Sequence, residues 1–150
     1  WAVVPDVIDG LPSENLALAR EWPHRADCAA PVWHLAEPLG QLFKLLELGF
    51  SRVCFGSSGR YWQGGSDHWC RRADEAFNAL AKEGGLPWVH MLRGLSLSGD
   101  RWPFASADST NVERNYNSAK FDPERMARRI DSVQCPIKWT TKHQQESLFA

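Results

Sequence analysis

Three carboxylates each follow a short apolar run that has the composition of a buried strand. They are Asp6, Glu37 and Asp108. A carboxylate held on rigid backbone at the end of a strand can act as a nucleophile or as a general base. Acidic residues are also common in turns and at the start of helices. Chemistry and capping are therefore two interpretations that the sequence leaves open for each acid.

Asp108 and the turn at Gly56 carry the most specific features. Small residues precede Asp108, and they leave room for a ligand beside its carboxylate. Gly56 and Ser57 follow another apolar run, and glycine lets backbone amides approach a ligand closely. The Gly-Lys-Ser/Thr ending of a phosphate-binding loop is missing, because Arg60 follows the turn instead. The turn is therefore more typical of a site that binds a carbonyl group than of a phosphate site.

The elements that must position these residues alternate along the chain. Apolar runs predict strands at about residues 1–5, 31–36, 53–55, 88–92 and 104–107. Apolar residues at helical spacing predict helices at about residues 13–20, 39–46, 69–80 and 123–133. We expect Ser13 to cap the first helix and Asp122 the last. Strands joined through helices form a parallel sheet, and their carboxyl ends meet at one rim.

The expected fold is therefore α/β, a parallel (β/α) barrel-like domain that forms a partial or incomplete TIM barrel. It covers residues 1–133, and residues 134–150 form a C-terminal extension or tail. A complete eight-stranded barrel needs about 200 residues or more, which is longer than this chain of 150 residues. In the last helix we expect Met126, Ile130 and Val133 to face the core.

Composition narrows the class of protein. With 43% hydrophobic and 23% charged residues, the chain is typical of a globular domain. No run approaches the about 20 apolar residues that span a bilayer, and no secretory signal is visible, so no membrane partner is expected. The net charge of −1 gives no overall attraction to nucleic acid. Four cysteines without a C-x-x-C pair favour reduced thiols and a cytoplasmic location.

Histidine and tryptophan positions add candidates for the core and for the wall of a pocket. His34 and His90 lie within predicted strands, and we expect both to be hydrogen-bonded interior residues. Trp62 and Trp102 lie in loops that follow strands, so they are candidates for a pocket wall. The histidines and cysteines form no metal-ligand motif, so neither a metal nor a cofactor is expected.

Four segments occur in an order that resembles a known enzyme family. They are the strand that ends in Asp6, the turn at Gly56 and Ser57, the run at residues 89–93 with Met91 and Arg93, and Asp108 followed by Glu113, Arg114 and Asn115. Over about residues 1–115, this order resembles the tRNA-guanine transglycosylase superfamily, including its phage-borne and DNA-directed relatives. The C-x-C-x-x-C zinc site and the Asp-Ser-Gly-Gly strand of that family are missing here.

The resemblance implies base exchange in a nucleoside of tRNA or DNA. Asp108 would attack C1′ and displace guanine, and a deazapurine base would then displace Asp108. The substrate-binding residues implied in the same way are Asp6, Gly56, Ser57, Met91, Arg93 and Arg114. The implied partners are a nucleic acid and a purine-like base. The missing strands imply either a homo-oligomer or a missing N-terminal half.

Two other functions are compatible with the same residues. A glycoside hydrolase would use two of Asp6, Glu37 and Asp108, with carboxyl groups roughly 5 to 9 Å apart. A non-catalytic barrel fragment would instead bind nucleic acid or another protein, with exposed aromatic side chains and an unpaired sheet edge.

Overall fold

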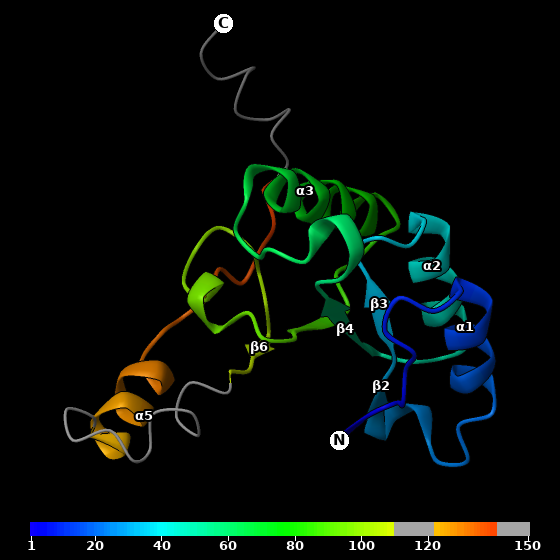
Figure 1. The fold of residues 1–150 in the computed structure, drawn as a ribbon, viewed down its shortest axis with the longest axis horizontal. Helices are drawn as coiled ribbons and strands as arrows, with labels where there is room; N and C mark the ends of the chain where they lie inside the picture. Colours follow the sequence, from blue (N-terminus) through cyan, green and yellow to red (C-terminus); the bar gives the residue numbers. More distant parts are fainter. Residues whose placement is uncertain (110–121, 141–150) are drawn as a thin grey trace, which may run out of the picture.

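The computed structural model describes residues 1–109 and 122–140 (Figure 1). The strands are β1 (Ala2–Val3), β2 (Ala29–Ala30), β3 (Val32–His34), β4 (Arg52–Gly56), β5 (Trp88–Met91) and β6 (Ser106–Ala107). The helices are α1 (Pro12–Arg20), α2 (Leu39–Glu47), α3 (Asp67–Lys82) and α5 (Pro123–Asp131), with short 3₁₀ turns η1 (Ala26–Cys28), η2 (Gly59–Tyr61) and η3 (Leu95–Leu97).

All of these strands pair in parallel, which confirms the α/β class. One sheet has the order β1-β2 and the other the order β3-β4-β5-β6. Pro31 separates β2 from β3, but its carbonyl accepts the backbone N–H of Cys54 in β4 at 2.8 Å. β2 and β3 are therefore two parts of one extended segment, and the order of neighbouring strands is β1, this segment, β4, β5 and β6. Within the described ranges the sheet is open, with β1 and β6 at its edges, so the closed wall of a barrel is not formed.

The register places alternate residues on opposite faces of the strands. One row aligns Val32, Cys54, His90 and Ser106, and the next row aligns Trp33, Phe55, Met91 and Ala107. The second row packs into the main core, to which helix residues such as Leu42 and Phe77 also belong. α1, α2 and α3 lie together on one side of the strands (Figure 1). We call the face that carries the first row the inner face.

Helix α3 shows how the sequence builds this core. Ser66 caps the helix, since its hydroxyl accepts the backbone N–H of Trp69 at 3.3 Å. Trp69, Ala73, Phe77 and Leu80 recur at spacings of three or four residues and are all buried. The apolar face predicted from the sequence is thus the face that covers the sheet.

Two helix starts differ in how well the sequence predicts them. The prediction for Ser13 is wrong, because α1 begins at Pro12 and the Glu14 carboxylate accepts the backbone N–H of Leu11 at 2.6 Å. Proline suits the first turn because its missing N–H would have no partner there. The prediction for Asp122 is confirmed, because its carboxylate accepts the backbone N–H of Arg125 at 3.0 Å.

The expected inward face of the last helix is wrong. α5 has no buried residue and stands apart from the strands (Figure 1), and Val133 is 40% exposed. After α5 the chain runs without strand or helix to Trp139, which returns to α3. The Trp139 indole N–H donates to the Asn78 side chain at 2.8 Å, and its ring lies 5.4 Å from that of Phe77.

Among the residues described, no helix is both long enough and apolar enough to cross a membrane.

Candidate active site

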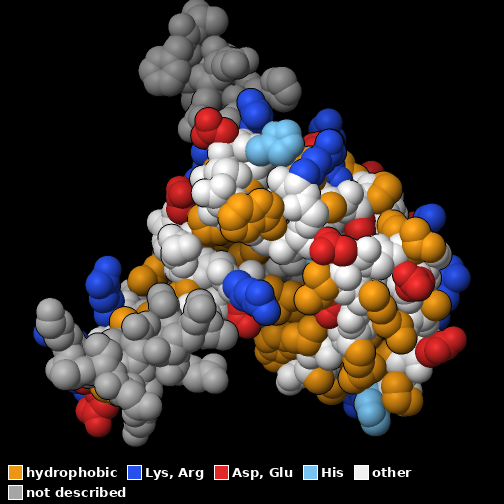
Figure 2. All heavy atoms as spheres, viewed as in Figure 1, with side chains coloured by type: hydrophobic (Ala, Val, Ile, Leu, Met, Phe, Trp, Pro, Cys, Tyr) orange, Lys and Arg blue, Asp and Glu red, His pale blue; other side chains and the backbone are white. Residues whose placement is uncertain are grey.

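A cavity of about 420 Å³ lies at the carboxyl ends of the strands. Among its lining residues are Asp6, Gly56, Ser57, Met91, Arg93 and Asp108. These are all of the sequence-predicted site residues that the structure describes, since Arg114 lies outside the described residues. On the face shown in Figure 2, basic and acidic side chains lie next to each other over β6, beside hydrophobic side chains over the neighbouring strands. Parallel pairing therefore brings the predicted residues to one place, although their roles remain predictions.

Asp108 is fixed by the strand next to it. Its backbone N–H donates to the carbonyl of Met91 at 3.3 Å, and its own carbonyl accepts the N–H of Leu95 at 3.2 Å. One carboxylate oxygen, Oδ1, accepts the backbone N–H of Arg93. The side chain is 53% exposed. Asp108 therefore ties a turn, as the capping interpretation expects, and it also lines the cavity, while its role in chemistry stays a prediction.

The turn after β5 has an unusual backbone that presents this donor. Arg93 has a φ of 56°, in the left-handed region that non-glycine residues enter at a cost of about 1–3 kcal/mol. A Cβ on the next residue, Gly94, would overlap the side chain of Met91. The tight turn directs the Arg93 N–H at Asp108 and leaves the Arg93 side chain exposed at the cavity.

Asp6 is held by a histidine that comes from the neighbouring strand. The Nε2 atom of His34 lies 2.8 Å from Oδ2 of Asp6, and His34 itself is buried. The His34 ring packs over Gly56, because a Cβ built there would lie 2.7 Å from its Nδ1 atom. Gly56 thus has a role beyond backbone access, since it makes the space that the imidazole needs.

His90 is a second buried histidine beside a carboxylate. Its Nδ1 atom lies 2.5 Å from the hydroxyl of Ser106, and its Nε2 atom lies 4.0 Å from Oδ2 of Asp108. Burial lowers the pKa of His90, while the negative charge of Asp108 acts to raise it. The sequence predicted an interior, hydrogen-bonded histidine, which is confirmed, but it missed the contact with Asp108. The signal was the two-residue spacing of Ser106 and Asp108, which directs both side chains to the same face of the extended chain.

The pKa of the Cys54 thiol is affected by the charges of both Asp6 and Asp108. It is fully buried on the inner face. Burial raises the pKa of the Cys54 thiol to about 12, and the charges of Asp108 and Asp6 act in the same direction. Both carboxylates are therefore near enough to act on one thiol, which stays protonated and is no nucleophile at neutral pH.

The other candidates have separate outcomes. Met91 is 1% exposed, and its side chain belongs to the core beneath the cavity. Trp62 is 72% exposed and lines the cavity, as a pocket wall requires. The expectation for Trp102 is wrong, because it is fully buried and its indole N–H donates to Asp74 at 3.0 Å.

Glu37 is separated from the other two acids. It is buried, and its Oε1 atom accepts the side-chain amide of Asn15 at 3.0 Å. The Asn15 side chain also holds the backbone of Val7 through contacts of 2.7 and 3.3 Å. Glu37 lines a different, smaller cavity of about 190 Å³. Its position supports a structural role, in which it anchors the loop after Asp6.

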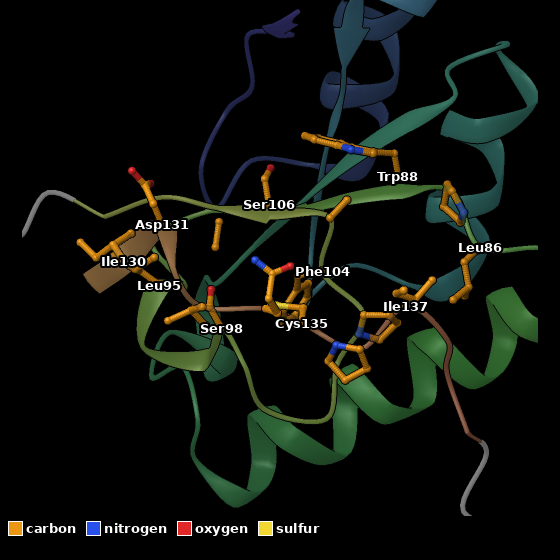
Figure 3. Close-up of a pocket in the computed structure, with 17 residues that line it drawn as sticks. Leu86, Trp88, Leu95, Ser98, Phe104, Ser106, Ile130, Asp131, Cys135 and Ile137 are labelled. Atoms are coloured by element: carbon orange, nitrogen blue, oxygen red, sulfur yellow. The ribbon is translucent and has the colours of Figure 1, made fainter. Parts of the chain in front are cut away.

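A larger cavity of about 640 Å³ lies away from these acids, between the segment that ends in β6 and the chain after α5 (Figure 3). Leu86, Phe104, Ile130 and Ile137 contribute apolar side chains to its lining. Asp131 is the one carboxylate among the lining residues. This cavity is the larger of the two, but the cavity of about 420 Å³ is the one that both Asp6 and Asp108 line.

In the part of the chain that the structure describes, no group of three or more histidine, cysteine, aspartate or glutamate side chains is arranged to hold a metal ion. Comparisons with protein-family models, curated proteins and solved structures give no match.

Proposed function

We propose that this chain is the catalytic part of a base-exchange enzyme that acts on tRNA or DNA, in the manner of the tRNA-guanine transglycosylase superfamily. The observation that carries the proposal is the shared cavity of Asp6, Gly56 and Asp108 at the carboxyl ends of parallel strands. Active sites of parallel α/β proteins lie at this end. The volume of about 420 Å³ is within the range of small-molecule sites, about 300–1,000 Å³.

The strand order supports a partial (β/α) barrel as the scaffold. Strands that follow one another in chain order, with helices on one side, are typical of barrels. A doubly wound sheet instead reverses its order at a switch point. We propose that β1, the segment that contains β2 and β3, β4, β5 and β6 are consecutive strands of such a barrel. The remaining strands come from another part of the same polypeptide or from a second copy.

Asp108 is the nucleophile in the proposed reaction. Its carboxylate oxygen forms a bond to C1′ of the target nucleoside while the bond from C1′ to guanine breaks, and the departing guanine anion takes up a proton from solvent. The covalent glycosyl intermediate is then attacked by a deazapurine base, which loses its N–H proton to solvent, forms the new C1′–N bond and restores the carboxylate. Two displacements of this kind replace one difficult substitution by two easier ones.

Asp6 and Trp62 recognise the base in the same scheme. A base that reacts at C1′ must leave the stack and enter a pocket. Asp6 accepts hydrogen bonds from ring N–H and exocyclic amino groups, and backbone at Gly56 and Ser57 lies on the same wall. Trp62 offers an exposed indole at the rim for stacking.

The cysteines support a cytoplasmic location, because Cys28, Cys54, Cys70 and Cys135 are all free thiols.

The test is incorporation of radiolabelled guanine into tRNA and into DNA. We expect exchange with one of them, and Asp108→Ala to lower the rate at least about 1,000-fold, because no covalent intermediate can form. Asp131→Asn, which alters an exposed acid on α5, is the control and should keep the wild-type rate.

Two outcomes would contradict the proposal. Cleavage of an oligosaccharide that depends on both Asp6 and Asp108 would support the glycoside hydrolase. Asp6 and Asp108 are the two of the three candidate acids that line one cavity, so they would be its carboxylate pair. Binding of nucleic acid without exchange would support a non-catalytic fragment.

A further inference from the structure

The inner face of β5 and β6 brings three polar side chains into one group. His90 and Ser106 are register partners across the two strands. Asp108 follows Ser106 by two residues, so it points to the same face. His90 is only 6% exposed, and it does not line the cavity that Asp108 enters. Any effect of His90 on chemistry must therefore pass through Asp108.

The His90 ring has a fixed orientation. Its Nδ1 atom is occupied by the Ser106 hydroxyl at 2.5 Å, which leaves Nε2 directed at Oδ2 of Asp108 at 4.0 Å. The ring of Trp88 is stacked at 6.1 Å and that of Trp1 meets it edge-on at 5.2 Å. Rotation of the imidazole would break its hydrogen bond with Ser106 and its packing against the rings of Trp88 and Trp1.

We infer that His90 is a positioning residue for Asp108, and that Ser106 sets its tautomer. The Ser106 hydroxyl donates to Nδ1, so the neutral imidazole carries its proton on Nε2. That N–H faces Oδ2 of Asp108 at 4.0 Å, an electrostatic contact that is longer than a hydrogen bond. The backbone N–H of Arg93 donates to the other oxygen, Oδ1. The hydrogen bond from Arg93 and the longer contact with His90 act on different oxygens and so favour one orientation of the carboxylate. The inference rests on the proposed role of Asp108 as the nucleophile.

The charges around the ring agree with a neutral imidazole. Burial, the larger effect, lowers the pKa of His90, and the charge of Asp108 opposes it. The Cys54 thiol, the register partner on β4, has a pKa raised to about 12 and is uncharged at neutral pH. The Arg52 guanidinium lies over the ring of Trp88, 5.7 Å from the ring centroid, and Trp88 is the residue stacked on His90. His90 therefore faces Asp108 as a neutral ring, with the Nε2–H directed at the carboxylate.

The first test is ¹⁵N NMR of the histidine side chains in the full chain, which needs no catalytic activity. We expect His90 to be the Nε2–H tautomer and Ser106→Ala to give a mixture of tautomers. Asp108→Asn should move the His90 titration to lower pH, because it removes the charge that raises this pKa. Asp131→Asn is the matched control and should leave the titration unchanged. A His90 titration and tautomer that ignore both Ser106 and Asp108 would overturn the inference.

The second test measures base exchange. We expect His90→Leu to lower kcat about 100-fold with little change in KM, the scale for misplacing a reacting group by about 1 Å. His90→Gln, which keeps an N–H donor but cannot titrate, should restore part of the rate. Thermal unfolding of both variants separates this effect from loss of fold. Equal losses in the two folded variants would count against positioning. Absence of exchange in the wild-type chain would refute the proposed function, while the NMR result would still decide the role of His90.

Discussion

At the scale of single residues, each acid at the cavity has a buried histidine beside it from the adjacent strand. His34 lies 2.8 Å from Asp6, and His90 lies 4.0 Å from Asp108. The His34 contact is a hydrogen bond, and the His90 contact is a longer electrostatic one. His34 also lines the cavity, whereas His90 lies outside its lining and can act only through its neighbours.

Gly56 is the residue on which the first of these pairs depends. A Cβ at this position would lie 2.7 Å from Nδ1 of His34 and 3.2 Å from Cγ1 of Val32. We expect Gly56→Ala to displace His34, to break its contact with Asp6 and to destabilise the fold by about 1–3 kcal/mol. Chemical denaturation measures the loss.

Gly40 gives the matched control for this substitution. It lies in the first turn of α2, and a Cβ there would meet nothing within 4 Å. Gly40→Ala should keep or raise the stability, by up to about 1 kcal/mol, because alanine favours helix. Similar losses in both variants would show that crowding of His34 is not the cause.

At the scale of elements, α3 carries the strongest link between sequence pattern and packing. Its buried residues face Phe55 and Phe104, with the Phe77 ring 5.5 Å from each of those rings. The same helix holds Trp102 and Arg101 through Asp74, with contacts of 3.0 Å to the Trp102 indole and 2.7 Å to Arg101. α3 therefore positions the segment that leads into β6 and Asp108.

Truncation of Phe77 tests this role. We expect Phe77→Ala to lower the free energy of unfolding by about 3–5 kcal/mol, the range for a fully buried aromatic side chain. Arg71→Ala, on the exposed side of the same helix, should change it by less than about 0.5 kcal/mol. The measurement is the midpoint of urea unfolding. A small loss for Phe77→Ala would mean that the surrounding core collapses onto the site.

At the scale of the whole molecule, the chain after α5 returns to the α/β body. Trp139 connects it to α3 through Asn78 and Phe77. Cys135 adds a weaker contact, because the backbone N–H of Gly99 lies 3.4 Å from its sulfur. This return path forms one wall of the cavity of about 640 Å³ (Figure 3).

Removal of the Trp139 ring should release this segment. We expect Trp139→Ala to speed proteolytic cleavage between residues 132 and 140 by about tenfold, because losing about 1.4 kcal/mol of local stability raises the open population tenfold. Cleavage is followed by mass spectrometry. Trp62 is an exposed tryptophan that is far in sequence from the cleaved segment, so Trp62→Ala should leave the cleavage rate unchanged. Equal rates in wild type and Trp139→Ala would contradict the proposed anchoring.

Local patterns in the sequence determined most of the elements. Alternation of apolar runs and helical spacing predicted the parallel strands and α1 to α3, and Asp122 was predicted as a cap because Pro123 and Glu124 follow it. Such signals depend on neighbours within about one helical turn, so no tertiary contact is needed to see them. The prediction also brought Asp6, Gly56 and Asp108 to one rim, because parallel pairing fixes which strand ends meet.

Contacts between distant residues were decided by the tertiary structure alone. The sequence placed Trp102 in a pocket wall, but Asp74, 28 residues away, draws it into the core. It placed Glu37 among the candidate acids, but Asn15 holds that side chain in a separate buried contact. It gave α5 an inward face, but no layer covers that helix in the described residues. The burial of a side chain and its hydrogen-bond partners depend on residues that are distant in sequence and pack against it. The spacing of residues along the chain does not show which distant residues these are.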